Sequence, residues 1–135
     1  MNYLLDTNVV SELMKPVPAE QVFTWLNQNG DDCHVSAITI GEIEQGLELL
    51  PDGAKKIRLN NAYRNFWRII EKRIMPFEIN AARRWSVLTA KHQKLGRRLP
   101  TLDSMLEATA LYWGMTLVTR NTADFAEADT FNPWL

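Results

Sequence analysis

Acidic residues stand at four places in this sequence where a catalytic or metal site could form. Asp6 directly follows the apolar run 3–5, Glu42 lies early in a helical segment, Asp103 opens another, and Asp124 follows a β-branched run. Each has an ordinary structural explanation, as a helix cap, a partner of the helix dipole or a surface turn. Carboxylates that converge, however, repel one another unless a hard cation such as Mg²⁺ neutralises them. Such a site with a basic face nearby would indicate metal-dependent phosphodiester chemistry.

Two residues, Asn121 and Asp124, are candidates for the fourth position of the site. Asn121 lies closer than Asp124 to the end of the apolar run 115–119. An amide oxygen and a carboxylate oxygen are both acceptable ligands for a hard cation. The sequence leaves open which of the two completes the set.

The elements that must position these residues alternate between short strands and helices. Strands are expected at 2–5, 33–36, 74–77, 115–119 and 130–132. Helices are expected at 7–14, 19–29, 39–50, 54–73, 79–95 and 102–113, with a helical turn at 122–127. This alternation predicts an α/β fold with a mostly parallel central sheet flanked by helices. Ligands of such sheets bind outside the carboxyl ends of the strands, which is where Asp6 stands.

The bulk composition is that of an ordinary globular protein. The 135 residues are 46% hydrophobic and 23% charged, which predicts a single domain over residues 1–135 and excludes a disordered chain. No apolar stretch approaches the roughly 20 residues of a membrane span, and no secretory signal is recognisable. The single cysteine, Cys33, excludes an internal disulfide and fits a cytoplasmic location.

The basic residues are concentrated in one part of the chain. Residues 55–98 hold 13 of the 15 basic residues and only two acids, Glu71 and Glu78. This window therefore carries +11, which leaves −12 for the rest of a chain whose net charge is −1. The separation indicates either a polyanion-binding face beside an acidic region or simply two helices with solvated basic faces.

Five segments together resemble a known family. The segments are "LLDTNVVSEL", "SAITIGEIEQG", "LPTLDSMLEATAL", "LVTRNTADF" and "NPWL", and they cover nearly the whole chain in order. They look like PIN-domain proteins and, more closely, like the VapC/FitB-type toxins of bacterial type II toxin–antitoxin modules. The resemblance implies a PIN fold and a Mg²⁺- or Mn²⁺-dependent endoribonuclease.

The resemblance also assigns roles to individual residues. Asp6, Glu42 and Asp103 match the three acidic positions of the family, Asn121 and Asp124 are the candidates for the fourth, and Thr7 and Thr119 match supporting polar positions. We expect Asp6 and Asp103 to contact the metal, and the remaining oxygen ligands to bind directly or through water.

Glu107 departs from the family pattern, which usually has a small residue, often alanine, at this position. Glu107 lies four residues after Asp103 and therefore on the same helical face. It could add a carboxylate to the site or turn outward. We expect it to turn outward, because an extra buried charge is costly without a partner.

The predicted mechanism needs no histidine. A metal-activated water would attack the phosphodiester in line, so His34 and His92 are expected to be structural or exposed. Lys94, Arg97 and Arg98 precede Asp103 and are the candidates for contacts with RNA. The five tryptophans are expected to be core or interface anchors. The resemblance further implies a homodimer, an antitoxin that masks the site, and promoter DNA bound mainly through the antitoxin complex.

Two other functions compete with this interpretation. A PIN-like subunit could act mainly in a promoter-binding complex, with little nuclease activity. A phospho-acceptor receiver domain would also place an aspartate after its first strand, but the expected acidic pair and late lysine are missing: Asn2 and Tyr3 stand at the first strand, and Arg120-Asn121 follow the late one. The sequence does not identify the RNA target, of which a tRNA is one possibility.

Overall fold

The computed structural model describes all 135 residues and contains a five-stranded sheet with six α-helices. The strands are β1 (Tyr3–Leu5), β2 (Cys33–Ser36), β3 (Ile74–Met75), β4 (Thr116–Val118) and β5 (Thr130–Phe131). The helices are α1 (Thr7–Leu13), α2 (Glu20–Asn29), α3 (Ala37–Leu49), α4 (Ala54–Ile70), α5 (Ile79–Lys94) and α6 (Thr101–Trp113). Three short 3₁₀ helices cover Gly30–Asp32, Glu71–Arg73 and Thr122–Asp124.

The sheet is entirely parallel, with strand order β3-β2-β1-β4-β5 and β1 at its centre. Leu5 is in register with Val35 of β2 on one side and with Val118 of β4 on the other. The carboxyl ends of the three central strands therefore meet at one edge, so the residues that follow them are neighbours. The predicted α/β fold with a parallel central sheet is confirmed.

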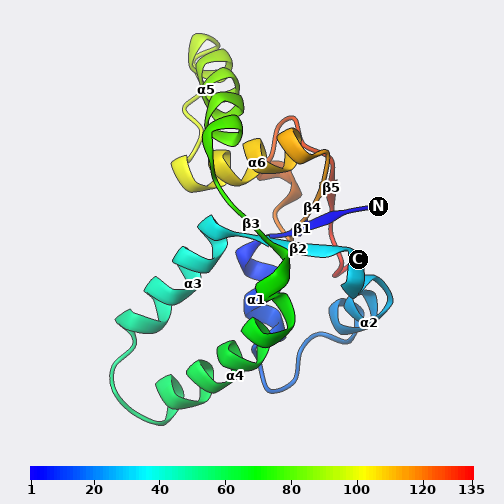
Figure 1. Ribbon diagram of the computed structural model, residues 1–135, viewed down its shortest axis with the longest axis vertical. Coiled ribbons are helices and arrows are strands. Elements are labelled where there is room, and N and C mark those ends of the chain that lie inside the picture. The colour runs from blue at the N-terminus through cyan, green and yellow to red at the C-terminus, as the bar shows by residue number, and fades with distance from the viewer.

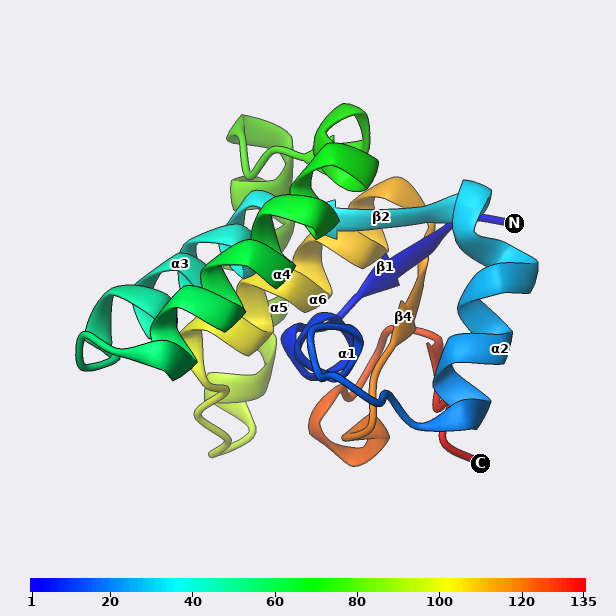
Figure 2. The same cartoon turned by 90° about the horizontal axis from the view of Figure 1, so that it is seen from below.

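Successive residues of a strand point to opposite faces of the sheet, so alternate residues belong to two separate hydrophobic cores. Leu5 and Val118 face the cluster formed with α1, α2, α3 and α4, whereas Leu4 and Leu117 face the smaller cluster formed with α6. Figure 1 shows the resulting layers, with α5 and α6 above the sheet and α3 and α4 below it. Figure 2 shows α1 just beyond the carboxyl end of β1.

A glycine turn ends α6 and returns the chain to the sheet. Gly114 follows the last residue of α6 with a φ of +66°, a left-handed conformation that favours glycine. The backbone N–H of Met115 then donates to the carbonyl of Ala110 at 2.9 Å, and the chain turns back into β4. Because helix and strand run in opposite directions, the first turn of α6 lies toward the carboxyl edge of the sheet. No helix in the structure is both long and apolar enough to cross a membrane.

Candidate active site

Asp6 lies at the carboxyl edge of the sheet, immediately after the central strand. Its backbone N–H donates to the carbonyl of Val118 at 2.9 Å, which continues the pairing of β1 with β4 by one residue. Its Oδ1 accepts from the backbone N–H of Thr7 at 2.7 Å, so Asp6 caps α1. The side chain is only 8% exposed, and the cap therefore holds a nearly buried carboxylate in one orientation.

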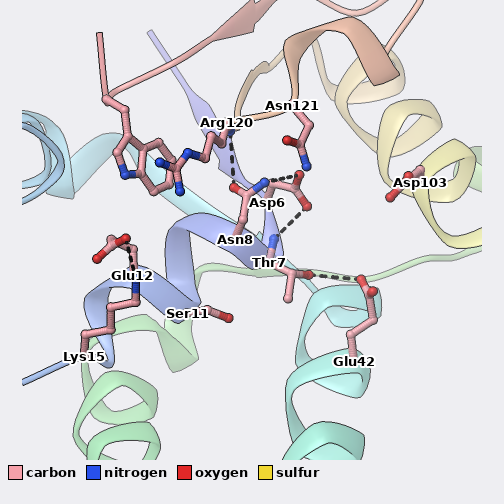
Figure 3. Close-up of a pocket in the computed structure, with 11 residues that line it drawn as sticks. Asp6, Thr7, Asn8, Ser11, Glu12, Lys15, Glu42, Asp103, Arg120 and Asn121 are labelled. Atoms are coloured by element: carbon pink, nitrogen blue, oxygen red, sulfur yellow. Dashed lines mark hydrogen bonds and ion pairs between the residues drawn. The ribbon is translucent and has the colours of Figure 1, made fainter. Parts of the chain in front are cut away.

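The other oxygen of Asp6 is held by two neutral donors. The buried Thr119 Oγ1 donates to Oδ2 at 2.7 Å, and Asn8 Nδ2 donates to the same oxygen at 3.3 Å. Thr119 Oγ1 also accepts from the backbone N–H of Asn121 at 3.0 Å. One threonine at the end of β4 thus ties the first acid of the site to the loop that carries Asn121. Figure 3 shows Asp6 and Asn121 on the same side of the cavity.

Glu42 lies in the second turn of α3 and points toward the same region. Its Oε1 accepts from Thr7 Oγ1 at 3.0 Å, so the residue beside Asp6 orients a second carboxylate (Figure 3). Burial raises the pKa of Glu42, the negative charges of Asp6 and Asp103 raise it further, and the Thr7 hydrogen bond opposes the shift.

Asp103 is the third residue of α6, whose N-cap position is occupied by Pro100. It is therefore not the helix cap that its sequence context also allowed. Burial raises the pKa of Asp103, and the charges of Asp6, Asp124 and Glu107 add to the effect. Two of the three acids thus bind protons more tightly than isolated carboxyls do, first because they are partly buried and second because like charges lie nearby.

The three acids line a single open cavity of about 460 Å³. Asn121 also lines this cavity, whereas Asp124 does not and its side chain is exposed in the 3₁₀ turn Thr122–Asp124. Asp124 is close enough for its charge to raise the pKa of Asp103. The geometry therefore places Asn121 in the cavity and Asp124 at its margin.

The donors in this cavity have the chemistry of a site for a hard cation. They are carboxylate, amide and hydroxyl oxygens, with neither sulfur nor histidine among the lining residues. No three acidic, histidine or cysteine side chains close around one point. Such an open set suits Mg²⁺, which binds few protein carboxylates and keeps several waters. Burial is the main cause of the raised pKa values of Glu42 and Asp103, and the repulsion from neighbouring carboxylates, which is the smaller cause, is the part that a cation would relieve.

Comparison with known proteins places the chain in a family. The family model described as "PIN domain" matches residues 3–130. The chain belongs to the PIN domain family. The resemblance of its five sequence segments to this family is confirmed, and all four residues that line the cavity as candidate ligands lie within the matched range.

Two curated relatives match nearly the whole PIN domain. "Toxin FitB" of Neisseria gonorrhoeae is 36% identical over 135 residues, covering 97% of both chains. "VapC ribonuclease Y4jK" of Sinorhizobium fredii is 33% identical and covers 97% of this chain and 96% of the relative. Among solved structures, "Structure of FitAB bound to IR36 DNA fragment" superposes with a TM-score of 0.87 at 34% identity, covering 98% of this chain and 96% of that one.

Glu107 is not turned outward, so that expectation is wrong. It is 2% exposed, and its Oε2 accepts from the backbone N–H groups of Glu127 and Ala128 at 2.8 and 3.0 Å. The buried charge has the partners it needs, although they are main-chain donors 20 and 21 residues away. Glu107 therefore fastens the loop after β4 to α6, one turn beyond Asp103.

Six other residues that line the cavity were not predicted from the sequence, namely Asn8, Ser11, Glu12, Lys15, Arg120 and Trp134. Glu12 is 6% exposed; its carboxylate accepts from Lys15 Nζ at 3.1 Å and from the backbone N–H of Ala19 at 3.3 Å. Burial opposes ionisation, but these donors outweigh it and the pKa of Glu12 is lowered. The sequence did contain a signal for Glu12, because this acid lies on the same helix as the buried Val9 and Val10. Lys15, Arg120 and Trp134 also line the cavity, and nothing local in the sequence marks them.

The basic residues proposed to bind RNA lie outside this cavity. Arg97 and Arg98 line a separate hollow of about 230 Å³ beside the first turn of α6, while Lys94 is exposed at the end of α5. The histidines are also elsewhere. His92 is 3% exposed and its Nε2 is 3.0 Å from Glu127 Oε2, and His34 Nδ1 is 3.1 Å from the carbonyl of Asp32.

Proposed function

We propose that this PIN domain is a divalent-metal-dependent endoribonuclease, the toxin of a bacterial type II toxin–antitoxin module. The observation that carries the proposal is one oxygen-lined cavity, which gathers Asp6, Glu42, Asp103 and Asn121 from four segments of the chain. The curated relatives named as a toxin and as a VapC ribonuclease support both parts of the proposal.

Asp6 and Asp103 would contact the metal ion, Mg²⁺ or Mn²⁺, with Glu42 and Asn121 completing the set directly or through water. Asp124, at the margin, would act through water or through its charge. When bound, the ion supplies positive charge that acidifies water and stabilises the phosphate in the transition state. Asp6, Glu42, Asp103 and Asp124 together form the proposed catalytic set.

The chain's own residues orient the carboxylates before substrate binds. Thr119 and Asn8 hold Asp6, and Thr7 holds Glu42, through hydrogen bonds of 2.7 to 3.3 Å. An acidic side chain of the cavity would accept a proton from the attacking water, and Glu42, oriented by Thr7, is the candidate. Neither histidine lines the cavity, so a histidine base is not part of the mechanism.

RNA would bind across the acidic cavity and the basic side chains near the start of α6. Lys94, Arg97 and Arg98 would bind backbone phosphates on the α6 side, which makes affinity dependent on salt. The hollow at Arg97 and Arg98 adjoins the helix that carries Asp103, so a strand in contact with both would be fixed relative to the site.

The partners, the oligomeric state and the location of the protein are also proposed. The FitAB structure with DNA supports an antitoxin partner, through which the complex would bind promoter DNA. A homodimer is supported by exposed apolar side chains at α5, a helix that projects from the body in Figure 1. They are Ile79 and Val87 on the helix and Leu95 directly after it. The proposed location is the bacterial cytoplasm.

Incubation of the purified chain with total RNA tests the enzymatic part. Cleavage should require Mg²⁺ or Mn²⁺, stop with EDTA, and leave 5′-phosphate ends, because water rather than the 2′-hydroxyl is the nucleophile. Contaminating metal-independent ribonucleases would instead leave 5′-hydroxyl ends. Asp6→Asn and Asp103→Asn should each abolish cleavage. Activity that survives in Asp6→Asn, or that does not need a divalent ion, would exclude the proposed site.

The fourth position is tested by a matched pair. Asn121→Ala removes an oxygen from the cavity wall, whereas Asp124→Asn changes a charge at the margin. We expect the larger loss of activity from Asn121→Ala. The opposite ranking would make Asp124 the fourth residue of the site. A chain that binds promoter DNA with its antitoxin but never cleaves RNA would instead support the non-catalytic alternative.

A further inference from the structure

Only two basic residues lie outside the window 55–98, and both line the acidic cavity. They are Lys15 and Arg120. Lys15 is already engaged, because its Nζ pairs with Glu12 Oε1 at 3.1 Å. Arg120 forms no ion pair and its guanidinium makes no hydrogen bond within the chain. A free guanidinium beside several carboxylates needs an explanation.

Stacking on an indole ring holds the guanidinium in place. Arg120 Cζ lies 4.9 Å from the centroid of the Trp134 ring. This cation–π contact holds the guanidinium carbon over the ring face, and no hydrogen bond within the chain uses the guanidinium N–H donors. An arginine held in this way is arranged for a ligand that accepts a fork of hydrogen bonds.

The backbone at Arg120 is also fixed by two asparagines. Its N–H donates to Asn8 Oδ1 at 3.3 Å, and its carbonyl accepts from Asn132 Nδ2 at 3.4 Å. Asn132 Oδ1 accepts in turn from the backbone N–H of Trp134 at 2.9 Å. Asn132 therefore connects the arginine backbone to the tryptophan backbone. The segments "TRN" and "NPW" are held together by these two hydrogen bonds.

Arg120 is directly coupled to the proposed catalytic centre. It follows Thr119, whose hydroxyl donates to Asp6, and Asn8 contacts both the Asp6 carboxylate and the Arg120 backbone (Figure 3). A phosphate bound by the guanidinium would be held in fixed register with the acids. The acids themselves repel phosphate, so a cation at the cavity wall is needed to bring the strand in.

We propose that Arg120, stacked on Trp134, binds a phosphate of the RNA strand next to the scissile one and so sets the register of the substrate in the cavity. This inference rests on the proposed nuclease function and adds a substrate-binding residue to it. The ligand class is the phosphodiester of single-stranded RNA, which presents paired oxygens to the guanidinium fork.

Fluorescence anisotropy with a fluorescein-labelled, mixed-sequence, single-stranded RNA octamer tests the inference. All variants carry Asp6→Asn in the full-length chain, which prevents cleavage while Mg²⁺ is present. Arg120→Gln should weaken binding about tenfold, the loss expected for charge-assisted hydrogen bonds. It should also reduce the slope of log K against log salt by about 0.7, the value for one phosphate contact on a single strand.

Three further variants separate charge from geometry. Arg120→Lys keeps the charge, so the salt slope should be unchanged while affinity falls about threefold, because the fork is lost. Trp134→Leu should also weaken binding at constant slope. Arg83→Gln removes the same charge from an exposed site on α5 and should change affinity at most about twofold, because salt screens distant charges. Equal effects of Arg83→Gln and Arg120→Gln would overturn the inference.

The outcome can be distinguished from failure of the proposed function. In the chain with Asp6 intact, Arg120→Gln should raise KM more than it lowers kcat. If the parent cleaves RNA but Arg120→Gln changes neither RNA affinity nor KM, this inference alone is wrong. If Arg120→Gln leaves RNA binding intact but weakens the complex with the co-expressed antitoxin, Arg120 binds a protein carboxylate instead. If the parent neither binds nor cleaves RNA, the proposed function fails and the inference fails with it.

Discussion

Removing the Glu107 carboxylate should release the loop after β4 and destabilise the chain by about 3 kcal/mol. Two backbone N–H groups donate to its Oε2, at 2.8 and 3.0 Å. Hydrogen bonds to a charged acceptor contribute about 1.5–3 kcal/mol each, which bounds the loss for Glu107→Ala near 3–6 kcal/mol. Glu127 and Ala128 are only half-buried, so water satisfies part of the need and the lower end applies. At about 4 °C per kcal/mol for this length, Tm should fall by about 10 °C.

Glu107→Gln is the matched control, because its amide oxygen can accept both hydrogen bonds at nearly the same volume. It exchanges charge-assisted bonds for neutral ones and should lose only about 1 kcal/mol. Urea unfolding gives both free energies, and hydrogen exchange follows the Glu127 and Ala128 amides directly. Those two amides should lose protection in Glu107→Ala and keep it in Glu107→Gln. Equal destabilisation by the two variants, with both amides still protected, would refute the assignment of Glu107 as a backbone acceptor.

Four more predictions follow from the site and the core. Thr119→Val should weaken Mn²⁺ binding and kcat/KM about 10- to 100-fold by removing the donor to Asp6, and Thr119→Ser should restore both; calorimetry and cleavage rates test this. Saturating Mg²⁺, at 100 times its Kd, should stabilise the parent by about 2.7 kcal/mol in urea unfolding, with no effect on Asp6→Asn. The pKa of Asp103 is raised in the folded chain by burial and by neighbouring carboxylates, so its ionisation lowers stability as pH rises through the shifted value. Asp103→Asn should therefore be more stable than the parent in EDTA at pH 7, and unfolding curves at falling pH should show the gain vanishing toward the ordinary value of 3.8. Burial raises the pKa of Cys33 to about 12, so a thiol reagent should react with it only after denaturation.

The sequence predicted the strands and the place of Asp6 from one physical rule, whereas Glu42 and Asp103 lie within helices and were assigned through the family resemblance. Apolar β-branched runs followed by a polar residue mark the carboxyl ends of buried parallel strands, and a parallel sheet brings those ends to one edge. The register of Leu5 with Val118 then makes neighbours of Asp6 and Thr119, which are 113 residues apart in sequence. Local sequence patterns were sufficient here, because pairing of parallel strands brings together residues that are far apart in the sequence.

Side chains whose partners lie in loops could not be predicted in the same way. Glu107 was expected to turn outward because nothing nearby in sequence could satisfy a buried charge. Its partners are main-chain N–H groups of a loop with no periodic pattern. Every residue except proline has such a group, so the sequence does not indicate which of them will face Glu107. Arg120 was missed for a related reason. Its position over Trp134 depends on how the segment after β5 folds back on the sheet.

The type of donor around the acids explains how the cavity keeps its charge. Thr7, Thr119 and Asn8 orient Glu42 and Asp6 through hydroxyl and amide hydrogens, which align a carboxylate without neutralising it. A lysine or arginine in their place would orient the acids equally well but would lower their affinity for a cation, because the charge would already be paired. The two cations of the cavity wall are kept from doing this. Lys15 is bound to Glu12, and the Arg120 guanidinium is held over an aromatic face. In the proposed mechanism the cavity would therefore hold a metal ion at its acids and a phosphate at its arginine at the same time.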